Sequence, residues 1–113
     1  MGTMDELKNP VEKKLLTRCK RAIREIDPTA EVILFGSRAR GDADNDSDYD
    51  LLILTDGNSG LKREDFFRQS LYPLELETGA VLSVIAFNRQ VWETPLYREM
   101  PFGKNVRREG VVL

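Results

Sequence analysis

The sequence predicts an α/β (α+β) fold in which a small mixed β-sheet carries helices packed on it. The first reason is the order of the expected elements, which is helix, strand, strand, helix, strand, helix and a short extended tail. The second is the composition, since 41% hydrophobic and 32% charged residues in a chain of 113 are typical of a globular domain. We therefore expect residues 1–113 to form a single domain.

The first expected element is a helix over residues 10–26. Asn9 can cap it, Pro10 suits its first turn, and Glu12 completes a capping box. The helix should stop at Asp27, which precedes a proline. Its basic residues cover the face opposite an apolar stripe, and we interpret them as solvated. The stripe comprises Val11, Leu15, Cys19, Ala22, Ile23 and Ile26.

Three segments are rich in residues that suit a buried strand: EVILF (31–35), DYDLLILT (48–55) and AVLSVIAF (80–87). A helix over 61–79 should be kinked or split at Pro73 and closed by Gly79. Asn88 can cap a short helix, and a further helix should run from Pro95 to the vicinity of residue 110. We expect Trp92 and Phe102 to be packing residues.

Composition excludes several classes of function. A net charge of −2, from 17 basic and 19 acidic residues, argues against nucleic acid as a direct ligand. The single cysteine cannot form an internal disulfide, and residues 1–10 are unlike a secretion signal, so we expect a cytoplasmic protein without membrane contact. The chain has no histidine, which excludes Ser-His-Asp and Cys-His catalysis. Any metal must therefore be held mainly by oxygen ligands.

A sharp turn is expected where the first strand ends, at Gly36 and Ser37. Glycine there allows positive φ or a close approach of another group to the backbone, and SRAR (37–40) is long enough for one helical turn. Such a turn, with the Ser37 hydroxyl and the guanidinium groups of Arg38 and Arg40, would suit a phosphate. The alternative is a plain connection whose arginines neutralise nearby aspartates, and this stretch alone does not decide between the two.

Aspartates occupy every second position from residue 42 to residue 50. Asp48 and Asp50 begin the second strand, so both side chains should point to one face, with Leu52 and Leu54 beyond them. Two half-buried carboxylates this close are unfavourable unless they share a proton or bind a cation. With phosphate donors beside them, the simplest cation is Mg²⁺ carried by a nucleotide.

The other three aspartates, Asp42, Asp44 and Asp46, are expected to form a solvated loop. An EF-hand would need Gly at its sixth position and Glu at its twelfth, and no frame that starts at these residues has them.

The stretch LFGSRARGDADNDSDYDLLIL resembles the signature of the polymerase-beta-type nucleotidyltransferase superfamily, and it is most similar to the minimal, antitoxin-like nucleotidyltransferases. The resemblance implies that Gly36 and Ser37 hold the triphosphate of a nucleotide, ATP in first place, and that Asp48 and Asp50 coordinate Mg²⁺. An acceptor would attack the α-phosphorus and release pyrophosphate. The acceptor is expected on another molecule or a second copy, and family members often act on a helical toxin of the HEPN class.

One departure from that family pattern concerns catalysis. Active members carry a third carboxylate on the strand after the second helix, where this chain has Ser83, and no acid occurs from residue 79 to residue 90. Loss of a general base typically costs about 10²- to 10⁴-fold in rate. The alternative function is therefore a degenerate binding module, an antitoxin with weak or absent catalysis. If its strand runs beside the second one, Ser83 should face the same side as Asp48 and Asp50.

Overall fold

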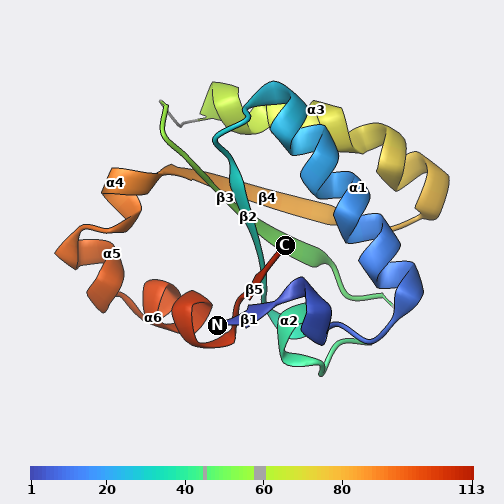
Figure 1. Ribbon diagram of the computed structural model, residues 1–113, viewed down its shortest axis with the longest axis horizontal. Coiled ribbons are helices and arrows are strands. Elements are labelled where there is room, and N and C mark those ends of the chain that lie inside the picture. The colour runs from blue at the N-terminus through green and yellow to red at the C-terminus, as the bar shows by residue number, and fades with distance from the viewer. Residues whose placement is uncertain (45, 58–60) are drawn as a thin grey trace.

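The computed structural model describes residues 1–44, 46–57 and 61–113. Its described strands form one mixed sheet in the order β1-β5-β2-β3-β4 (Figure 1). The long central pair, β2 and β3, is antiparallel, and β3 runs parallel to β4. The sheet is thus mixed, as predicted. The strands are β1 (Gly2–Thr3), β2 (Glu31–Phe35), β3 (Tyr49–Thr55), β4 (Leu82–Asn88) and β5 (Val111–Val112).

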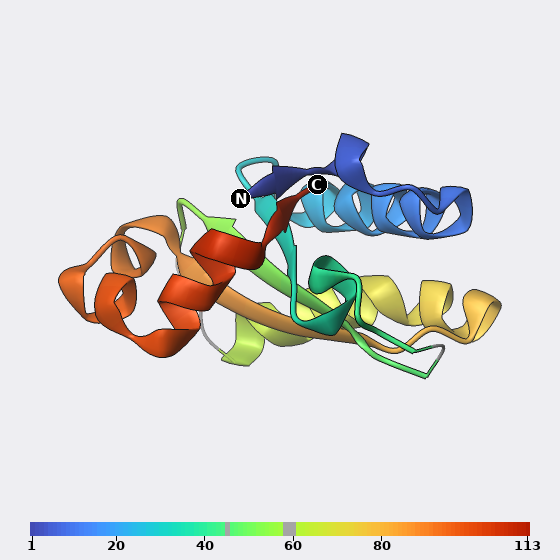
Figure 2. The ribbon, with the colours of Figure 1, turned by 90° about the horizontal axis from the view of Figure 1, so that it is seen from below.

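Helices cover both faces of the sheet. The two long helices, α1 and α3, pack on one face, and the short helices α4, α5 and α6 gather at one end on the other face (Figures 1 and 2). The helices are η1 (Met4–Glu6), α1 (Pro10–Ile26), α2 (Ser37–Arg40), α3 (Leu61–Thr78), α4 (Arg89–Trp92), α5 (Pro95–Glu99) and α6 (Pro101–Glu109). No helix in the described part of the chain has the length and apolar content needed to cross a bilayer.

The alternation of side chains along β3 decides which core each residue enters. Leu51 and Ile53 are buried among residues of α1 and α3, whereas Leu52 and Leu54 are buried with Trp92 and Val106 on the opposite face. Asp50 belongs to the second set by alternation. The predicted face is therefore confirmed for Asp50, and it is the face that α4–α6 partly cover. Asp48 was expected inside the strand and half-buried; instead it precedes Tyr49, the first residue of β3, and is exposed.

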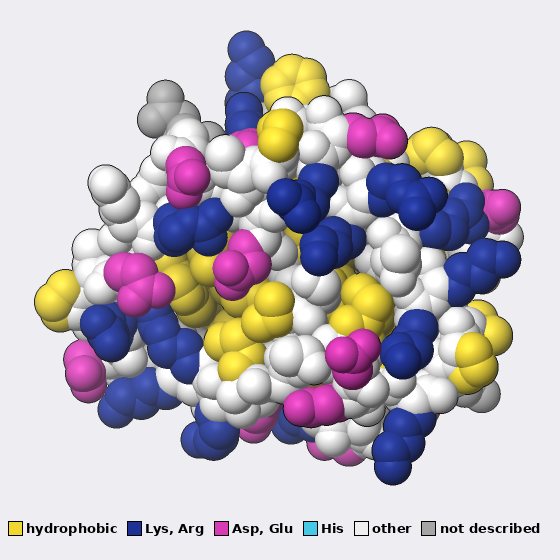
Figure 3. Space-filling model, viewed as in Figure 1, with side chains coloured by type: hydrophobic (Ala, Val, Ile, Leu, Met, Phe, Trp, Pro, Cys, Tyr) yellow, Lys and Arg dark blue, Asp and Glu magenta, His cyan; other side chains and the backbone are white. Residues whose placement is uncertain are grey.

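Helix α1 carries a solvated basic face, as expected. None of its lysines and arginines is buried, and Lys and Arg side chains gather over it in Figure 3. The predicted apolar stripe is right in its centre, where Leu15, Cys19 and Ile23 are buried, and wrong at its two ends, where Val11 is 76% exposed and Ile26 36%. Val11 lines a solvent-open pocket, together with Leu15 of the same helix and Tyr49 of β3.

Three features differ from the prediction. Helix α3 runs without interruption through Pro73, because buried Phe67, Leu71 and Leu74 pack the helix on both sides of the proline. The helix expected after Pro95 is two helices, α5 and α6, because Pro101 holds Met100 in an extended conformation (φ −63°, ψ 144°). The N-terminal strand β1 was not predicted; it pairs with β5, and the Gly2 N–H donates to the Gly110 carbonyl at 2.8 Å.

Side chains of α3 occupy the outer edge of β4. Outward-pointing backbone groups of that edge strand receive charged partners, so they are not left as a template for pairing with another chain. The contacts also fix β4, the strand that carries Ser83. They join the Glu75 carboxylate to the Leu82 N–H (2.9 Å), the Arg68 guanidinium to the Val84 carbonyl (3.3 Å), and the Glu64 carboxylate to the Ala86 N–H (3.0 Å).

Candidate active site

The turn after β2 brings backbone against a carboxylate. Gly36 has φ 75° and ψ −158°, and a Cβ atom built on it would lie 2.4 Å from Oδ2 of Asp50. Both reasons for a glycine, positive φ and close approach, are therefore met at this one residue. The single helical turn α2 follows directly, with the Gly36 carbonyl accepting from the N–H groups of Ala39 and Arg40, both at 3.1 Å.

The acidic residues converge with Ser83 at the adjoining end of β3. Asp50 is the register partner of Ser83 in the parallel β3–β4 pair, so their side chains point to the same face. The Ser83 hydroxyl donates to Oδ2 of Asp48 at 3.4 Å. The predicted position of Ser83 beside both carboxylates is thus confirmed.

The electrostatics of this group favour a cation. Burial, and next the negative charge of Asp48, raise the pKa of the Asp50 carboxyl above its ordinary value. Both effects disfavour the negatively charged form of Asp50, and a bound divalent cation would offset both of them.

The donor set fits an ion that arrives with its own ligands. Among the residues that the structure describes, no three or more Asp, Glu, His or Cys side chains form a metal-binding group. Mg²⁺ is commonly bound by one or two carboxylates and completes its shell with water and substrate phosphate oxygens. Asp48 and Asp50 can therefore hold a nucleotide-borne Mg²⁺, and they do not form a cage for a free ion.

An apolar recess of about 160 Å³ adjoins the carboxylate of Asp50. Its lining combines two aromatic rings with the polar groups of Asp50 and Ser83, and consists of Phe35, Asp50, Ser83, Val84, Ile85 and Phe102. Phe102 also packs edge-on against Phe35, with ring centroids 5.4 Å apart. Packing alone was predicted for Phe102, and its place beside the site was missed. Phe35 and Asp50 are register partners in β2 and β3, so their side chains point to the same face of the sheet. Strand alternation could therefore have indicated an aromatic ring beside this carboxylate.

Trp92 shows the packing role that was predicted for it. Only 2% of its surface is exposed, and its ring contacts those of Phe87 and Phe102.

The two arginines of the turn lie in different surroundings. Arg40 forms ion pairs with Asp42 (3.2 Å) and with Glu109 of α6 (3.4 Å), and its side chain is 43% exposed. Arg38 is 12% exposed; its guanidinium contacts Glu12 and lies over the ring of Tyr49. Because Tyr49 stands between Asp48 and Asp50 in the chain, its side chain faces away from theirs. The structure thus groups Arg38 with the α1 side of the sheet and separates it from the carboxylates.

The loop before β3 is exposed at all three predicted positions, Asp42, Asp44 and Asp46. Asp44 organises this loop, because its Oδ1 accepts from the Asp46 N–H (2.9 Å) and the Ser47 hydroxyl (3.2 Å).

If these three carboxylates are solvated and bind no ligand, replacing all three by Asn should change the affinity for magnesium–nucleotide by less than about fivefold. That is the scale of the effects of exposed charges. Isothermal calorimetry on the triple variant measures this change. A loss as large as that of Asp50→Asn alone would place the loop inside the site.

The comparisons with known proteins agree with this geometry. Residues 16–101 match the family model described as a nucleotidyltransferase domain. The chain is 34% identical over 83 residues to the candidate protein adenylyltransferase MJ0604 of Methanocaldococcus jannaschii, an alignment that covers 74% of this chain and 76% of that protein.

A solved structure described as a toxin–antitoxin with AMP-PNP shares the fold at a TM-score of 0.60 and 14% identity, over 85% of this chain and 69% of that one. The family match and the sequence relative together confirm the resemblance carried by residues 34–54. The protein therefore belongs to the nucleotidyltransferase domain family, of the polymerase-beta type.

Proposed function

We propose that this protein binds a magnesium–nucleoside triphosphate, with ATP as the first candidate, and transfers its nucleotidyl group to a partner macromolecule. The observation that carries the proposal is the convergence of the Gly36 turn with the Asp48–Asp50 pair at one end of two neighbouring strands. Family membership supplies the chemistry that such a convergence serves.

The residues would divide the work as follows. The Gly36–Ser37 turn would receive the triphosphate, with the Ser37 hydroxyl as a donor and Arg40 as a cation at its edge. Asp48 and Asp50 would hold Mg²⁺, which supplies charge neutralisation at the phosphate oxygens. With the nucleotide so oriented, an acceptor oxygen bonds to the α-phosphorus as the bond to the leaving pyrophosphate breaks.

The acceptor is proposed to be a protein. The relative MJ0604 is described as acting on proteins, and the structural neighbour is described as a toxin–antitoxin that contains an ATP analogue. Together with the resemblance to minimal nucleotidyltransferases, these descriptions favour a HEPN-type toxin as the partner of this chain and ATP as the nucleotide.

A second candidate is a degenerate binding module that neutralises its partner without transferring a nucleotidyl group. The observation that favours it is the hydroxyl of Ser83, 3.4 Å from Asp48, where active relatives would carry a carboxylate able to accept the acceptor's proton. Incubation with labelled ATP, magnesium and a HEPN-type partner separates the two candidates, because only the transferase labels the partner.

Calorimetry with ATP and magnesium tests the site itself. Wild-type protein should bind, and Asp48→Asn combined with Asp50→Asn should abolish the binding, because neither amide carries the charge that Mg²⁺ requires. The Asp42, Asp44 and Asp46 triple variant is the matched control, since it removes more negative charge from the neighbouring loop. Equal binding by the wild type and the double variant would refute the assignment.

A further inference from the structure

We propose that Arg38 is a positioning residue, which holds Asp48 in place from the opposite face of the sheet and does not itself bind phosphate. The inference rests on the proposed function for its consequence, the binding of magnesium–nucleotide. The anchor itself rests on contacts of the described residues alone.

The first step concerns the hydrogen bonds from Arg38 to the backbone that leads into β3. Its Nε and Nη2 both donate to the carbonyl oxygen of Ser47, at 3.1 and 3.0 Å. That carbonyl belongs to the peptide bond that joins Ser47 to Asp48. A planar guanidinium that makes two bonds to one oxygen restrains the peptide in direction as well as in distance. The orientation of Asp48 is therefore tied to Arg38.

The second step is the support behind Arg38. Its Nη1 donates to Oε1 of Glu12 at 3.0 Å, and both side chains are largely buried, at 12% and 21% exposure. The guanidinium carbon lies 4.4 Å from the centroid of the Tyr49 ring. Burial, and next the negative charge of Glu12, raise the pKa of the Tyr49 hydroxyl, so the ring stands close to this ion pair. Glu12 in turn belongs to the first turn of α1, which Asn9 caps through the N–H groups of Val11 and Glu12.

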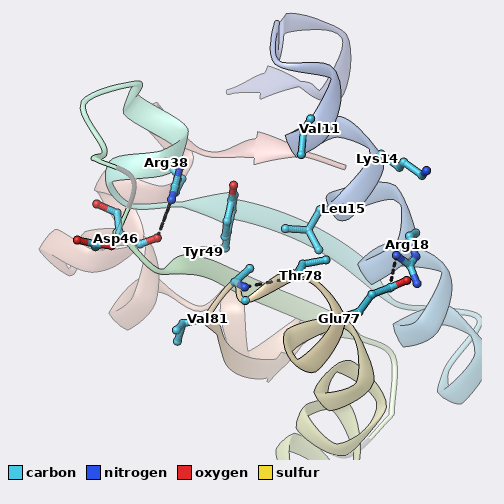
Figure 4. A pocket seen from close by; sticks show the side chains of 13 residues that line it. Val11, Lys14, Leu15, Arg18, Arg38, Asp46, Tyr49, Glu77, Thr78 and Val81 are labelled. Carbon is cyan, nitrogen blue, oxygen red and sulfur yellow. Dashed lines mark hydrogen bonds and ion pairs between the residues drawn. The ribbon is translucent and has the colours of Figure 1, made fainter.

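The third step is the location of the anchor. Arg38 and Tyr49 line a solvent-open pocket of about 540 Å³ between α1 and the end of α3, where Figure 4 shows them side by side. Asp48 and Asp50 flank Tyr49 in sequence and point to the other face. Arg38 is not among the buried core residues, so its replacement removes no core side chain.

A role as a phosphate ligand would require the opposite behaviour. Arg38 would have to leave the largely buried Glu12 carboxylate and the Ser47 carbonyl, which together already bind its three guanidinium nitrogens. Breaking such charged contacts is costly, so the residue is better suited to hold the loop than to follow a ligand.

The test compares four variants: Arg38→Gln, Arg38→Lys, Glu12→Gln and, as a matched control, Arg18→Gln. Arg18 lines the same pocket and pairs with Glu77, far along the chain from the loop. ATP affinity is measured by calorimetry with magnesium and again with EDTA. The ratio of the two affinities gives the contribution of the metal.

Arg38→Gln should lower the affinity for magnesium–ATP by at least tenfold and at most about 100-fold, the range known for residues that bond directly to a metal ligand. Metal-free ATP affinity should not change. Arg38→Lys should show the same loss of affinity, because lysine keeps the positive charge but lacks the planar guanidinium group that makes the two hydrogen bonds to Ser47. Arg18→Gln should match the wild type. Equal losses with and without magnesium, or rescue by lysine, would instead show a phosphate contact and overturn the proposal.

Amide hydrogen exchange of the nucleotide-free protein is the second measurement. The reporters are the N–H of Tyr49, bonded to the Val81 carbonyl at 2.9 Å, and the N–H of Asp46. Both should exchange faster in Arg38→Gln and Glu12→Gln and at the wild-type rate in Arg18→Gln. Unchanged exchange in both anchor variants would overturn the proposal.

The two measurements separate the two ideas. A wild-type protein that does not bind ATP would defeat the proposed function, while the exchange rates would still decide whether Arg38 anchors the loop. If Arg38→Gln is unfolded, with fast exchange throughout the chain, both the ATP affinity and the exchange rates are measured on Glu12→Gln instead.

Discussion

Gly36→Ala is expected to weaken magnesium–nucleotide binding by more than tenfold and to lower the free energy of unfolding by about 2–4 kcal/mol. The backbone of Gly36, at φ 75° and ψ −158°, lies in a region that is nearly restricted to glycine. In addition, the new methyl group would stand 2.4 Å from Oδ2 of Asp50, well inside van der Waals contact. Either the turn or the carboxylate must move, and both belong to the proposed site.

Gly41→Ala is the matched control for this prediction. Gly41 also has positive φ, 82°, but ψ is 11°, and a methyl group there would meet no described atom within 4 Å beyond its chain neighbours. Its substitution should cost only the left-handed conformation, about 1 kcal/mol, and should leave nucleotide affinity unchanged. Urea unfolding and calorimetry on both variants measure the two effects. Equal behaviour of the two glycine variants would mean that the contact between Gly36 and Asp50 does not matter.

The parts of the fold and site that sequence predicted correctly follow from short-range rules. Period-two alternation placed Asp50, Leu52 and Leu54 on one face, and the packing of Leu52 and Leu54 with Trp92 agrees. The same rule, applied to a neighbouring strand, placed Ser83 beside the carboxylates. The conformation of Gly36 was predictable because glycine alone tolerates both positive φ and the close approach of another group to the backbone.

The parts that sequence did not predict depend on contacts distant in the chain. Nothing near Arg38 indicates which face of the sheet its side chain takes, because the choice is made by Glu12, 26 residues away. The strand β1 forms only because β5 lies beside it. Pro101 is different, since a local rule on the residue before proline would have predicted the break between α5 and α6.

Ser83→Asp has the largest expected effect on catalysis. Ser83 is exposed and its hydroxyl lies 3.4 Å from Oδ2 of Asp48, so an aspartate there would reach the same site. If the protein transfers a nucleotidyl group, the new carboxylate would supply a base for the acceptor's proton and a further ligand for the metal. The rate of adenylylation of a partner protein should then rise, by at most about 10²- to 10⁴-fold.

The stability of the same variant should depend on pH and on metal. The negative charges of Asp48 and Asp50 should raise the pKa of a third carboxyl group placed beside them. In the wild type, burial is the larger cause of the raised pKa of Asp50, and the charge of Asp48 is the second cause. A carboxyl whose pKa is higher in the folded state than in the unfolded state binds its proton more tightly when folded. Its destabilising effect is therefore absent at low pH and grows as pH rises through the unfolded and then the folded pKa.

Magnesium with ATP should remove this destabilisation, because the cation neutralises the added charge. Thermal unfolding at two pH values, with and without magnesium–ATP, measures the effect, and Ser83→Asn is the isosteric control without the charge. The result that contradicts the prediction is a variant destabilised equally at both pH values, with no recovery on addition of magnesium–ATP and no gain in transfer. In that case the side chain of residue 83 would be excluded from the metal site, and Ser83 would not occupy the position of a third carboxylate.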